Sequence, residues 1–289
     1  MNFKNAHLMT AMVTPFDDAG QLDKHRLASL IDYLLAHHTA GILVGGTTGE
    51  GPTLSEDEKL ALFQMTATLV AGRVPIMANT GSNNTAATIA FTRRVSQIAG
   101  IDAALVVVPP YNKPDQAGMV AHFTAIAERG GLPIMIYNIP GRVVVKMTVP
   151  TVLKLAKQPN IIGIKQCTSL EELAAIVEQA PADFYVYTGE DSQTLTATVL
   201  GAHGVISVAS HLYGDDMAAM LTQLDQGNWA AAGQSQRQLI PKMAALFSSP
   251  SPAPVKAALN QQHILVGEPR LPILPLTAEQ QATLFAELK

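Results

Sequence analysis

The feature that most constrains the fold of this chain is a repeated unit in which a short aliphatic run precedes a helical pattern. Each run is rich in branched aliphatic residues and ends in glycine, proline or polar residues, which is typical of buried strands. The runs are Leu8–Val13, Gly41–Gly45, Pro75–Ala78, Ala103–Val108, Pro133–Tyr137, Ile161–Cys167, Tyr185–Tyr187 and Val205–Val208. The sequence therefore predicts eight strands.

Helical patterns fill the intervals between these runs. Asp23 has the position of an N-cap, and apolar residues follow it at helical spacing from Leu27. Ser55 and Glu58 have the form of a capping box and open a helix that extends through Val70. Eight strand–helix units are typical of a closed parallel (β/α)8 TIM barrel, an α/β fold. A doubly wound open sheet is the alternative, but no Gly-x-Gly-x-x-Gly motif follows the first strand.

The repeat ends before the chain does. The unit after the eighth strand ends near Asp225, and the remaining segment is helix-rich. The proline-rich run 248–254 interrupts that segment and predicts a turn between two helices. We therefore expect a barrel catalytic domain over residues 1–225 and a C-terminal helical extension over residues 226–289 that packs on the barrel.

Composition and charge exclude several classes of function. The net charge of −4, the pI of about 6.0 and the absence of a Lys/Arg block argue against nucleic acid and membrane surfaces as partners. No apolar run is long enough to span a bilayer, and residues 1–7 lack the core of a signal peptide. The single cysteine, Cys167, fits a reducing cytoplasm. The histidines lack the spacing of metal ligands, so we expect neither a metal nor another cofactor.

Lys165 stands where the sixth apolar run gives way to a turn. An ammonium in that position is paired with an anion, reaches water or loses its proton. Burial lowers the pKa of an amine, and a neutral amine at the mouth of a pocket is a nucleophile for carbonyl carbons. A lysine whose ammonium simply reaches solvent fits the same position.

The turn after the second strand offers a binding site for an anion. Gly46-Thr47-Thr48-Gly49-Glu50 combines backbone N–H groups that are free of side chains with two hydroxyl groups, which suits a small carboxylate. An ordinary glycine turn explains the same residues. A phosphate-binding P-loop is excluded because no Gly-Lys-Ser/Thr follows.

Further polar residues follow other strands of the predicted barrel, at the end where barrel enzymes have their active sites. Tyr137 offers a phenol for proton transfer, and Arg142 offers a guanidinium that can bind a carboxylate. Tyr111 follows the fourth strand. Each of these residues taken alone also fits packing or a surface charge. Glu190 and Asp191 would repel a phosphate after the seventh strand, which argues for a substrate without phosphate.

Three motifs together resemble those of a known family. Gly46–Glu50, Tyr137–Arg142 and Ile162–Lys165 occur in the order and at the spacing of the dihydrodipicolinate synthase family, within the wider N-acetylneuraminate lyase family of class I aldolases. The resemblance covers nearly the whole chain and includes Met12–Phe16 and Gly204–Val208. It implies a lyase that condenses pyruvate with L-aspartate 4-semialdehyde through a Schiff base, in the biosynthesis of diaminopimelate and lysine.

The resemblance also implies roles for individual residues. Lys165 would form the Schiff base with pyruvate. Tyr137, Thr47 and Tyr111 would form a proton relay, with Tyr111 supplied by a neighbouring subunit. Thr48, together with the Thr47 backbone, would hold the carboxylate of pyruvate.

The remaining implied roles concern the second substrate and the assembly. Arg142 would bind the carboxylate of the semialdehyde, and Gly189 and the carbonyl of Ile206 would border the site. The resemblance implies a homotetramer built as a dimer of dimers, with no cofactor.

Some positions depart from the family pattern. Lysine-inhibited members use a histidine, a glutamate and a tyrosine where this chain has Glu56, Ala87 and Pro110, although Asn83 is kept. We therefore expect weak or absent inhibition by L-lysine.

Other departures lie closer to the catalytic motifs. Val143-Val144 replaces Thr-Gly after the arginine, Gln166-Cys167 replaces Glu-Ala after the lysine, and His211 stands where asparagine is common. None of these replacements removes an implied catalytic group.

Two alternatives to the synthase remain open from the sequence. One is an aldolase of the same family that acts on N-acetylneuraminate or a 2-keto-3-deoxy sugar acid. Arg142 argues against it, because neuraminate lyases lack an arginine there. The other is a barrel that binds pyruvate without turnover.

Overall fold

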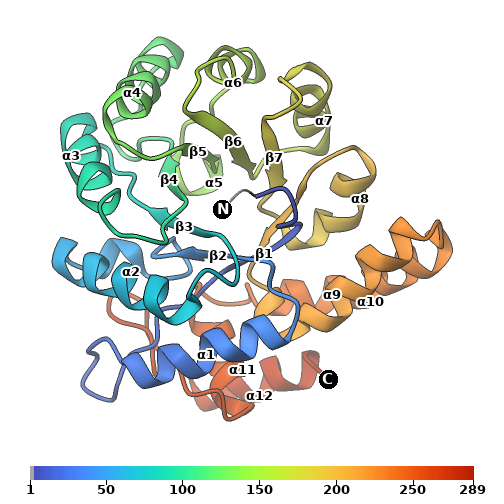
Figure 1. Ribbon diagram of the computed structural model, residues 1–289. Coiled ribbons are helices and arrows are strands. Elements are labelled where there is room, and N and C mark those ends of the chain that lie inside the picture. The colour runs from blue at the N-terminus through green and yellow to red at the C-terminus, as the bar shows by residue number, and fades with distance from the viewer. Residues whose placement is uncertain (1–2) are drawn as a thin grey trace.

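The computed structural model describes residues 3–289, and its central feature is a closed barrel of eight parallel strands (Figure 1). Met9 on the first strand pairs with Ile206 on the eighth, so the sheet closes on itself. The predicted TIM barrel is therefore confirmed, and the open sheet is excluded. The strands are β1 (Leu8–Ala11), β2 (Gly41–Val44), β3 (Ile76–Asn79), β4 (Ala103–Val107), β5 (Ile134–Asn138), β6 (Ile161–Gln166), β7 (Tyr185–Thr188) and β8 (Gly204–Ser207).

Helices form a ring around the strands, and further helices follow the last strand (Figure 1). The α-helices are α1 (Lys24–Ala36), α2 (Glu56–Val70), α3 (Thr85–Val95), α4 (Gln116–Arg129), α5 (Pro140–Val143), α6 (Val149–Leu155), α7 (Leu170–Gln179), α8 (Thr194–Val199), α9 (Ser210–Asp225), α10 (Trp229–Ala245), α11 (Ala253–Gln261) and α12 (Ala278–Glu287). Two short 3-10 helices are η1 (Gly51–Thr53) and η2 (Asp191–Gln193).

The predicted helix starts have the expected hydrogen bonds. The Asp23 carboxylate accepts the N–H groups of His25 and Arg26 at 2.8 and 3.0 Å. Ser55 and Glu58 form the reciprocal bonds of a capping box at the start of α2. These local bonds satisfy N–H groups that have no partner inside a helix.

The core has two layers because alternate side chains of each strand point to opposite faces. Met9, Met135 and Tyr137 belong to the interior of the barrel, whereas Ile134 and Ile136 pack outward against the helices. The barrel interior is thus filled by side chains and is not a channel.

The N-terminal segment covers one end of the barrel. The Tyr187 hydroxyl donates to the carbonyl of Ala6 at 3.0 Å, and the Val205 N–H donates to the carbonyl of His7 at 2.9 Å. The carboxyl ends of the strands lie at the opposite end, which stays open for a site. Met1 and Asn2, which belong to the predicted 1–225 domain and to the segment without a signal-peptide core, lie outside the described residues.

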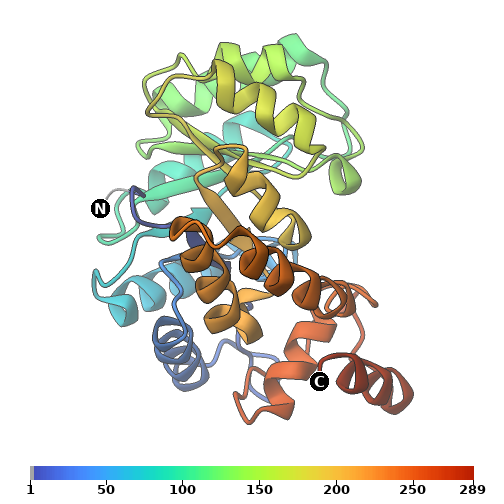
Figure 2. The same cartoon turned by 90° about the vertical axis from the view of Figure 1, so that its right-hand side faces the viewer.

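The helices after β8 lie to one side of the barrel (Figure 2). α9 ends at Asp225, and α10 packs along it. Residues 246–252 connect α10 to α11, so most of the proline-rich run 248–254 lies in a turn between two helices as predicted, and its last two residues begin α11. The division into domains at residue 225 stays a prediction. No helix within residues 3–289 has the length and apolar character needed to cross a membrane.

Candidate active site

Lys165 lies at the carboxyl end of β6 with its side chain in the barrel interior. Its Cα is paired with that of Tyr137 on β5 and that of Tyr187 on β7, so the three residues share one level of the barrel. Only 6% of Lys165 is exposed, and its ammonium lies 4.7 Å from the centre of the Tyr137 ring. The alternative of a lysine that simply reaches solvent does not fit this burial.

The charge state of Lys165 differs from the sequence-based expectation. Burial is the largest single effect on the amine and lowers its pKa, but the acidic groups of Tyr137, Cys167, Asp191 and Glu190 together outweigh it, so the pKa is raised. The expected lowered pKa is therefore wrong in direction. The resting amine carries a proton that has to leave before the nitrogen can attack a carbonyl carbon.

A cavity of about 360 Å³ opens above Lys165. It brings together six of the residues that the sequence predicted for the site, and it adds Glu190 and Cys167 from the adjoining turns, as well as Phe247 from the end of α10. The lining residues are Thr47, Thr48, Tyr137, Ile139, Gly141, Arg142, Lys165, Cys167, Gly189, Glu190, Val208 and Phe247.

Two predicted site residues are not among those that line the cavity. Ile206 is fully buried in the barrel interior, and Val208, two residues further along, lines the cavity in its place. Tyr111 is 89% exposed and has a left-handed φ of +73°. Within one chain Tyr111 therefore lies outside the cavity that contains Lys165.

The turn after β2 is held by hydrogen bonds on both sides. The Asn79 amide donates to the carbonyl of Gly45 at 3.0 Å, and the Thr14 hydroxyl donates to the carbonyl of Gly49 at 2.6 Å. A Cβ atom on Gly49 would lie 2.9 Å from the carbonyl oxygen of Met12, so no side chain fits there. The turn thus presents Thr47 and Thr48 to the cavity.

The Thr47 hydroxyl lies with the Tyr137 phenol in the wall of the cavity beside Lys165. Burial is the largest effect on Tyr137 and raises the pKa of its phenol, although Lys165 and the Thr47 hydroxyl act in the opposite direction and lower it. At neutral pH the phenol therefore keeps its proton. A phenol beside a hydroxyl can pass a proton along the pair, taking one and giving one in the same step.

The loop that carries Arg142 is fixed by two buried amides on adjacent strands. The Asn138 side chain accepts the N–H of Met147 at 3.1 Å and donates to its carbonyl at 2.9 Å. It also donates to the Gln166 side-chain carbonyl at 3.0 Å, and Gln166 donates to the Thr168 hydroxyl at 2.6 Å. Gln166 is thus a satisfied structural residue behind the site.

Gly189 leaves room for the side chains of Lys165 and Cys167. A Cβ atom there would lie 2.6 Å from Cε of Lys165 and would collide with Sγ of Cys167. Burial raises the pKa of the Cys167 thiol to about 12, and the nearby Glu190 carboxylate acts in the same direction. Cys167 is therefore a neutral thiol in the cavity wall and not a nucleophile.

His211 joins the ends of β1 and β8. Its Nε2 accepts the N–H of Val13 at 3.1 Å, and its Nδ1 bonds to the carbonyl of Val208 at 2.8 Å, so Nδ1 carries the hydrogen. Burial lowers the pKa of this histidine to about 4. His211 is therefore neutral at physiological pH. It links the ends of the two strands and does not line the cavity.

Three further positions are those at which the sequence differs from the lysine-binding pocket of inhibited family members. The Glu56 carboxylate pairs with the Arg94 guanidinium at 2.8 Å on the surface. Ala87 lies in the first turn of α3, and Pro110 is half-buried beside a second cavity of about 440 Å³ that adjoins the first. Weak or absent inhibition by L-lysine stays a prediction. Within residues 3–289, no cluster of three or more His, Cys, Asp or Glu side chains is arranged to hold a metal ion.

A TIM barrel with a buried lysine beside a phenol, at the carboxyl ends of its strands, defines a lyase of the class I aldolase type. Residues 4–289 match the model of the dihydrodipicolinate synthetase family, and the chain belongs to this family. The resemblance that the motifs indicated is therefore confirmed.

Individual relatives are similar over their full length. A protein of Ligilactobacillus salivarius named 4-hydroxy-tetrahydrodipicolinate synthase is 57% identical over 289 residues, which is 100% of each chain. The crystal structure of a dihydrodipicolinate synthase from Bacillus anthracis has a TM-score of 0.97 and 44% identity, covering 100% of this chain and 98% of that one. The enzyme from Cyanidioschyzon merolae with lysine bound has a TM-score of 0.94 and 39% identity, covering 99% and 97%.

Proposed function

We propose that this chain acts as a 4-hydroxy-tetrahydrodipicolinate synthase, in which Lys165 forms a Schiff base with pyruvate and L-aspartate 4-semialdehyde is the second substrate. The observation that carries the proposal is the position of Lys165, buried beneath a cavity next to the Tyr137–Thr47 pair. Full-length relatives with that name support it.

The reaction begins when the Lys165 amine, after losing its proton, attacks C2 of pyruvate. Loss of water gives an iminium, which accepts electrons when a C3 proton is removed, and an enamine results. The enamine carbon then attacks the aldehyde carbon of the semialdehyde, whose oxygen takes a proton. Finally the substrate amine displaces Lys165 from C2 and closes the ring. Because each step moves a proton, the Tyr137 phenol and the Thr47 hydroxyl are suitably placed to carry it.

Two groups would bind the carboxylates of the substrates. The turn that holds Thr47 and Thr48 would bind the carboxylate of pyruvate through hydroxyl and N–H groups. The Arg142 guanidinium, which lines the same cavity, would form a two-point contact with the carboxylate of the semialdehyde. Gly189 would border the lysine, and Ile206 would support the floor from the barrel interior.

The substrate is proposed to lack phosphate. Asp191 is the first residue of η2, and its carboxylate reaches the start of α9, where it accepts the N–H groups of Val208 and Ala209 at 3.2 and 2.9 Å. These are the kind of N–H groups that bind a phosphate in many barrels. With a carboxylate already bonded to them, a phosphate would be repelled.

We propose a cytoplasmic homotetramer, arranged as a dimer of dimers. The exposed position of Tyr111 supports a role across a subunit interface, because this side chain does not line the cavity of its own chain.

The Schiff base is tested by reduction of the protein with borohydride in the presence of pyruvate, followed by peptide mass spectrometry. We expect one adduct, on Lys165, and a rate of formation that rises with pH because the raised pKa keeps the resting amine protonated. Lys165→Ala should lose the adduct and at least about 1,000-fold in kcat. An adduct on another residue, or none, contradicts the mechanism.

The second substrate is tested with Arg142→Ala. We expect this variant to keep the pyruvate adduct but to lose roughly 100-fold in kcat/KM for the semialdehyde, as for a lost charged two-point contact. Turnover of N-acetylneuraminate or of a 2-keto-3-deoxy acid by the wild-type protein, in place of the semialdehyde, would contradict the assignment. An adduct without turnover of any aldehyde would indicate a pyruvate-binding barrel.

A further inference from the structure

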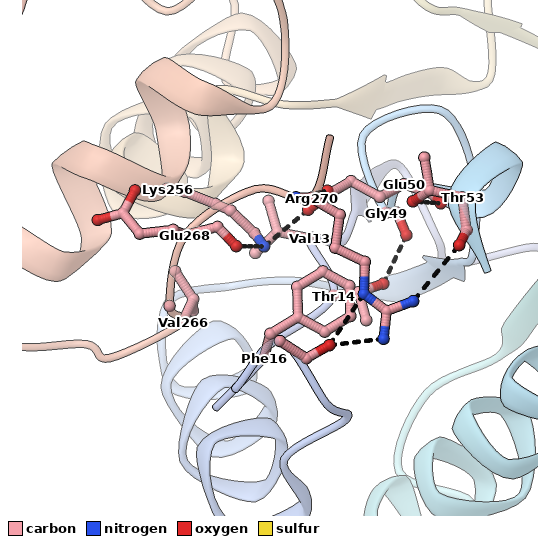
Figure 3. A network of polar contacts seen from close by, with 12 residues as sticks. Val13, Thr14, Phe16, Gly49, Glu50, Thr53, Lys256, Val266, Glu268 and Arg270 are labelled. Carbon is pink, nitrogen blue, oxygen red and sulfur yellow. Dashed lines mark hydrogen bonds and ion pairs between the residues drawn. The ribbon is translucent and has the colours of Figure 1, made fainter. Parts of the chain in front are cut away.

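A buried ion pair joins the turn after β2 to the C-terminal helices. Lys256 on α11 lies with its Nζ 2.7 Å from Oε1 of Glu50, and the two side chains are 0% and 3% exposed (Figure 3). Lys256 also donates to the carbonyl of Glu268 at 3.1 Å and lies 4.3 Å from the centre of the Phe16 ring. Glu50 directly follows the turn that presents Thr47 and Thr48.

The other oxygen of the Glu50 carboxylate is held by the same region of the chain. The N–H of Arg270 donates to Oε2 of Glu50 at 2.7 Å. The Arg270 guanidinium donates to the carbonyl of Gly20 at 2.6 Å and to Glu58 at 2.6 Å, and it lies 4.3 Å from the centre of the Phe16 ring. Both carboxylate oxygens are thus fixed by residues between 256 and 270.

Glu50 in turn determines the geometry of the turn. Its backbone has a left-handed φ of +55°, its N–H donates to the carbonyl of Thr47 at 3.1 Å, and its carbonyl accepts the hydroxyl of Thr53 at 3.0 Å. Its side chain is not among those that line the catalytic cavity. Any effect of Glu50 on the substrate therefore passes through the backbone of the turn.

Stability alone does not account for a pair of this kind. Removing two charges from water costs about as much as their attraction returns, so a well-packed apolar pair would stabilise the fold equally well. An apolar pair would not hold the side chain at position 50 in one orientation. An ion pair with a hydrogen-bonded carboxylate does so, because its contacts are directional.

We propose that Lys256 and Arg270 are positioning residues for the reaction, which hold Glu50 so that the turn presents Thr47 and Thr48 to the carboxylate of pyruvate. This inference rests on the proposed function, because it assumes that pyruvate binds above Lys165. In this proposal, contacts from the C-terminal segment determine the geometry of the pyruvate-binding turn.

The test separates positioning from folding by removing both charges at once. Lys256→Met alone leaves Glu50 charged and buried, which destabilises the fold, whereas the double variant Glu50→Gln/Lys256→Met has no unpaired charge. We expect the double variant to keep a thermal midpoint near that of the wild type. Its KM for pyruvate should rise, and its rate of borohydride-trapped adduct formation should fall, by about 10- to 100-fold, as for a binding group displaced by about 1 Å.

Lys242→Met is the matched control. Lys242 also lies over an aromatic ring, that of Tyr213 at 5.2 Å, but it lies on α10 and has no contact with Glu50. This variant should keep wild-type kinetics.

Arg270→Ala gives a second measurement, because it leaves the buried ion pair in place and loosens the segment around it. The pyruvate KM should rise in this variant too. Wild-type pyruvate kinetics in both Arg270→Ala and the double variant would overturn the positioning role, while the Lys165 adduct in the wild type would leave the proposed function intact. Absence of that adduct in the wild type would overturn both.

Discussion

At the scale of single residues, the backbone of Val144 shows a physical cost of a departure from the family pattern. It stands where the resemblance implies a glycine, and its φ is +70°, a left-handed conformation that a β-branched residue adopts only with strain. Its N–H closes the short helix α5 by donating to the carbonyl of Pro140 at 2.9 Å. The strain is thus located next to Arg142, at the end of the loop that places the guanidinium.

Replacing this residue should relieve the strain. We expect Val144→Gly to raise the free energy of unfolding by about 1 kcal/mol, since a left-handed non-glycine residue costs roughly 1–3 kcal/mol and glycine loses part of that gain through its greater freedom in the unfolded chain. Denaturant unfolding of the two proteins measures the difference. Val199→Gly, at an exposed valine in α8, should instead destabilise the protein. A loss of stability in Val144→Gly would contradict the account.

At the scale of the elements, the strand ends are joined by contacts that are themselves sensitive to pH. His211 binds the ends of β1 and β8 as a neutral ring, with a pKa lowered to about 4 by burial. An unfolded histidine takes up its proton near pH 6.5. Between these values the unfolded chain binds a proton that the folded chain does not. The contribution of His211 to the free energy of unfolding is therefore complete above pH 6.5 and decreases as the pH falls toward 4.

The contribution of this histidine can be measured by its replacement. His211→Asn keeps a donor and an acceptor but cannot titrate. As the pH falls from about 6.5 to 4, we expect the free energy of unfolding of this variant to decrease by roughly 3 kcal/mol less than that of the wild type. Thermal midpoints across that range measure the change in slope. His25→Asn, at an exposed histidine on α1, should leave the slope unchanged. If the stability of His211→Asn fell with pH as steeply as that of the wild type, His211 would not be the source of the loss. Buried His122, whose pKa is also lowered to about 4, would then be the source.

At the scale of the whole molecule, one chain supplies every proposed catalytic group except Tyr111. The closed barrel brings Thr47, Tyr137 and Lys165 to one cavity from β2, β5 and β6. Tyr111 is exposed at the end of the same strands but outside that cavity. The proposed proton relay therefore needs a second copy of the chain.

Complementation between inactive subunits tests this requirement. Lys165→Ala and Tyr111→Phe chains are expected to be impaired alone, but a hybrid dimer has one site with both groups intact. Random mixing should recover up to about a quarter of the wild-type activity, because half of the dimers are hybrids with one complete site of two. A mixture of Lys165→Ala with Tyr137→Phe should recover nothing, because both groups belong to one chain's cavity. Equal results from the two mixtures would contradict a shared site.

The sequence by itself determined the barrel and half of the residues that line the cavity at its open end. Repeated strand–helix units permit few architectures, and in a parallel barrel the residue after each strand lies at the same end. Lys165, Tyr137, Thr47, Thr48, Arg142 and Gly189 could therefore be placed at one end of the barrel from their order along the chain, and the resemblance to the family joined them into one site.

Only the tertiary structure decided the features that depend on contacts between distant segments. Phe247 enters the cavity from the end of α10, and the pair of Glu50 and Lys256 links the turn after β2 to α11. The direction of the Lys165 pKa shift depends on which negative groups surround a buried amine, and the exposure of Tyr111 depends on how its loop leaves the barrel. Hydrophobic periodicity records which face of an element is buried, but not which residue of another element it meets, because that is fixed by packing in three dimensions.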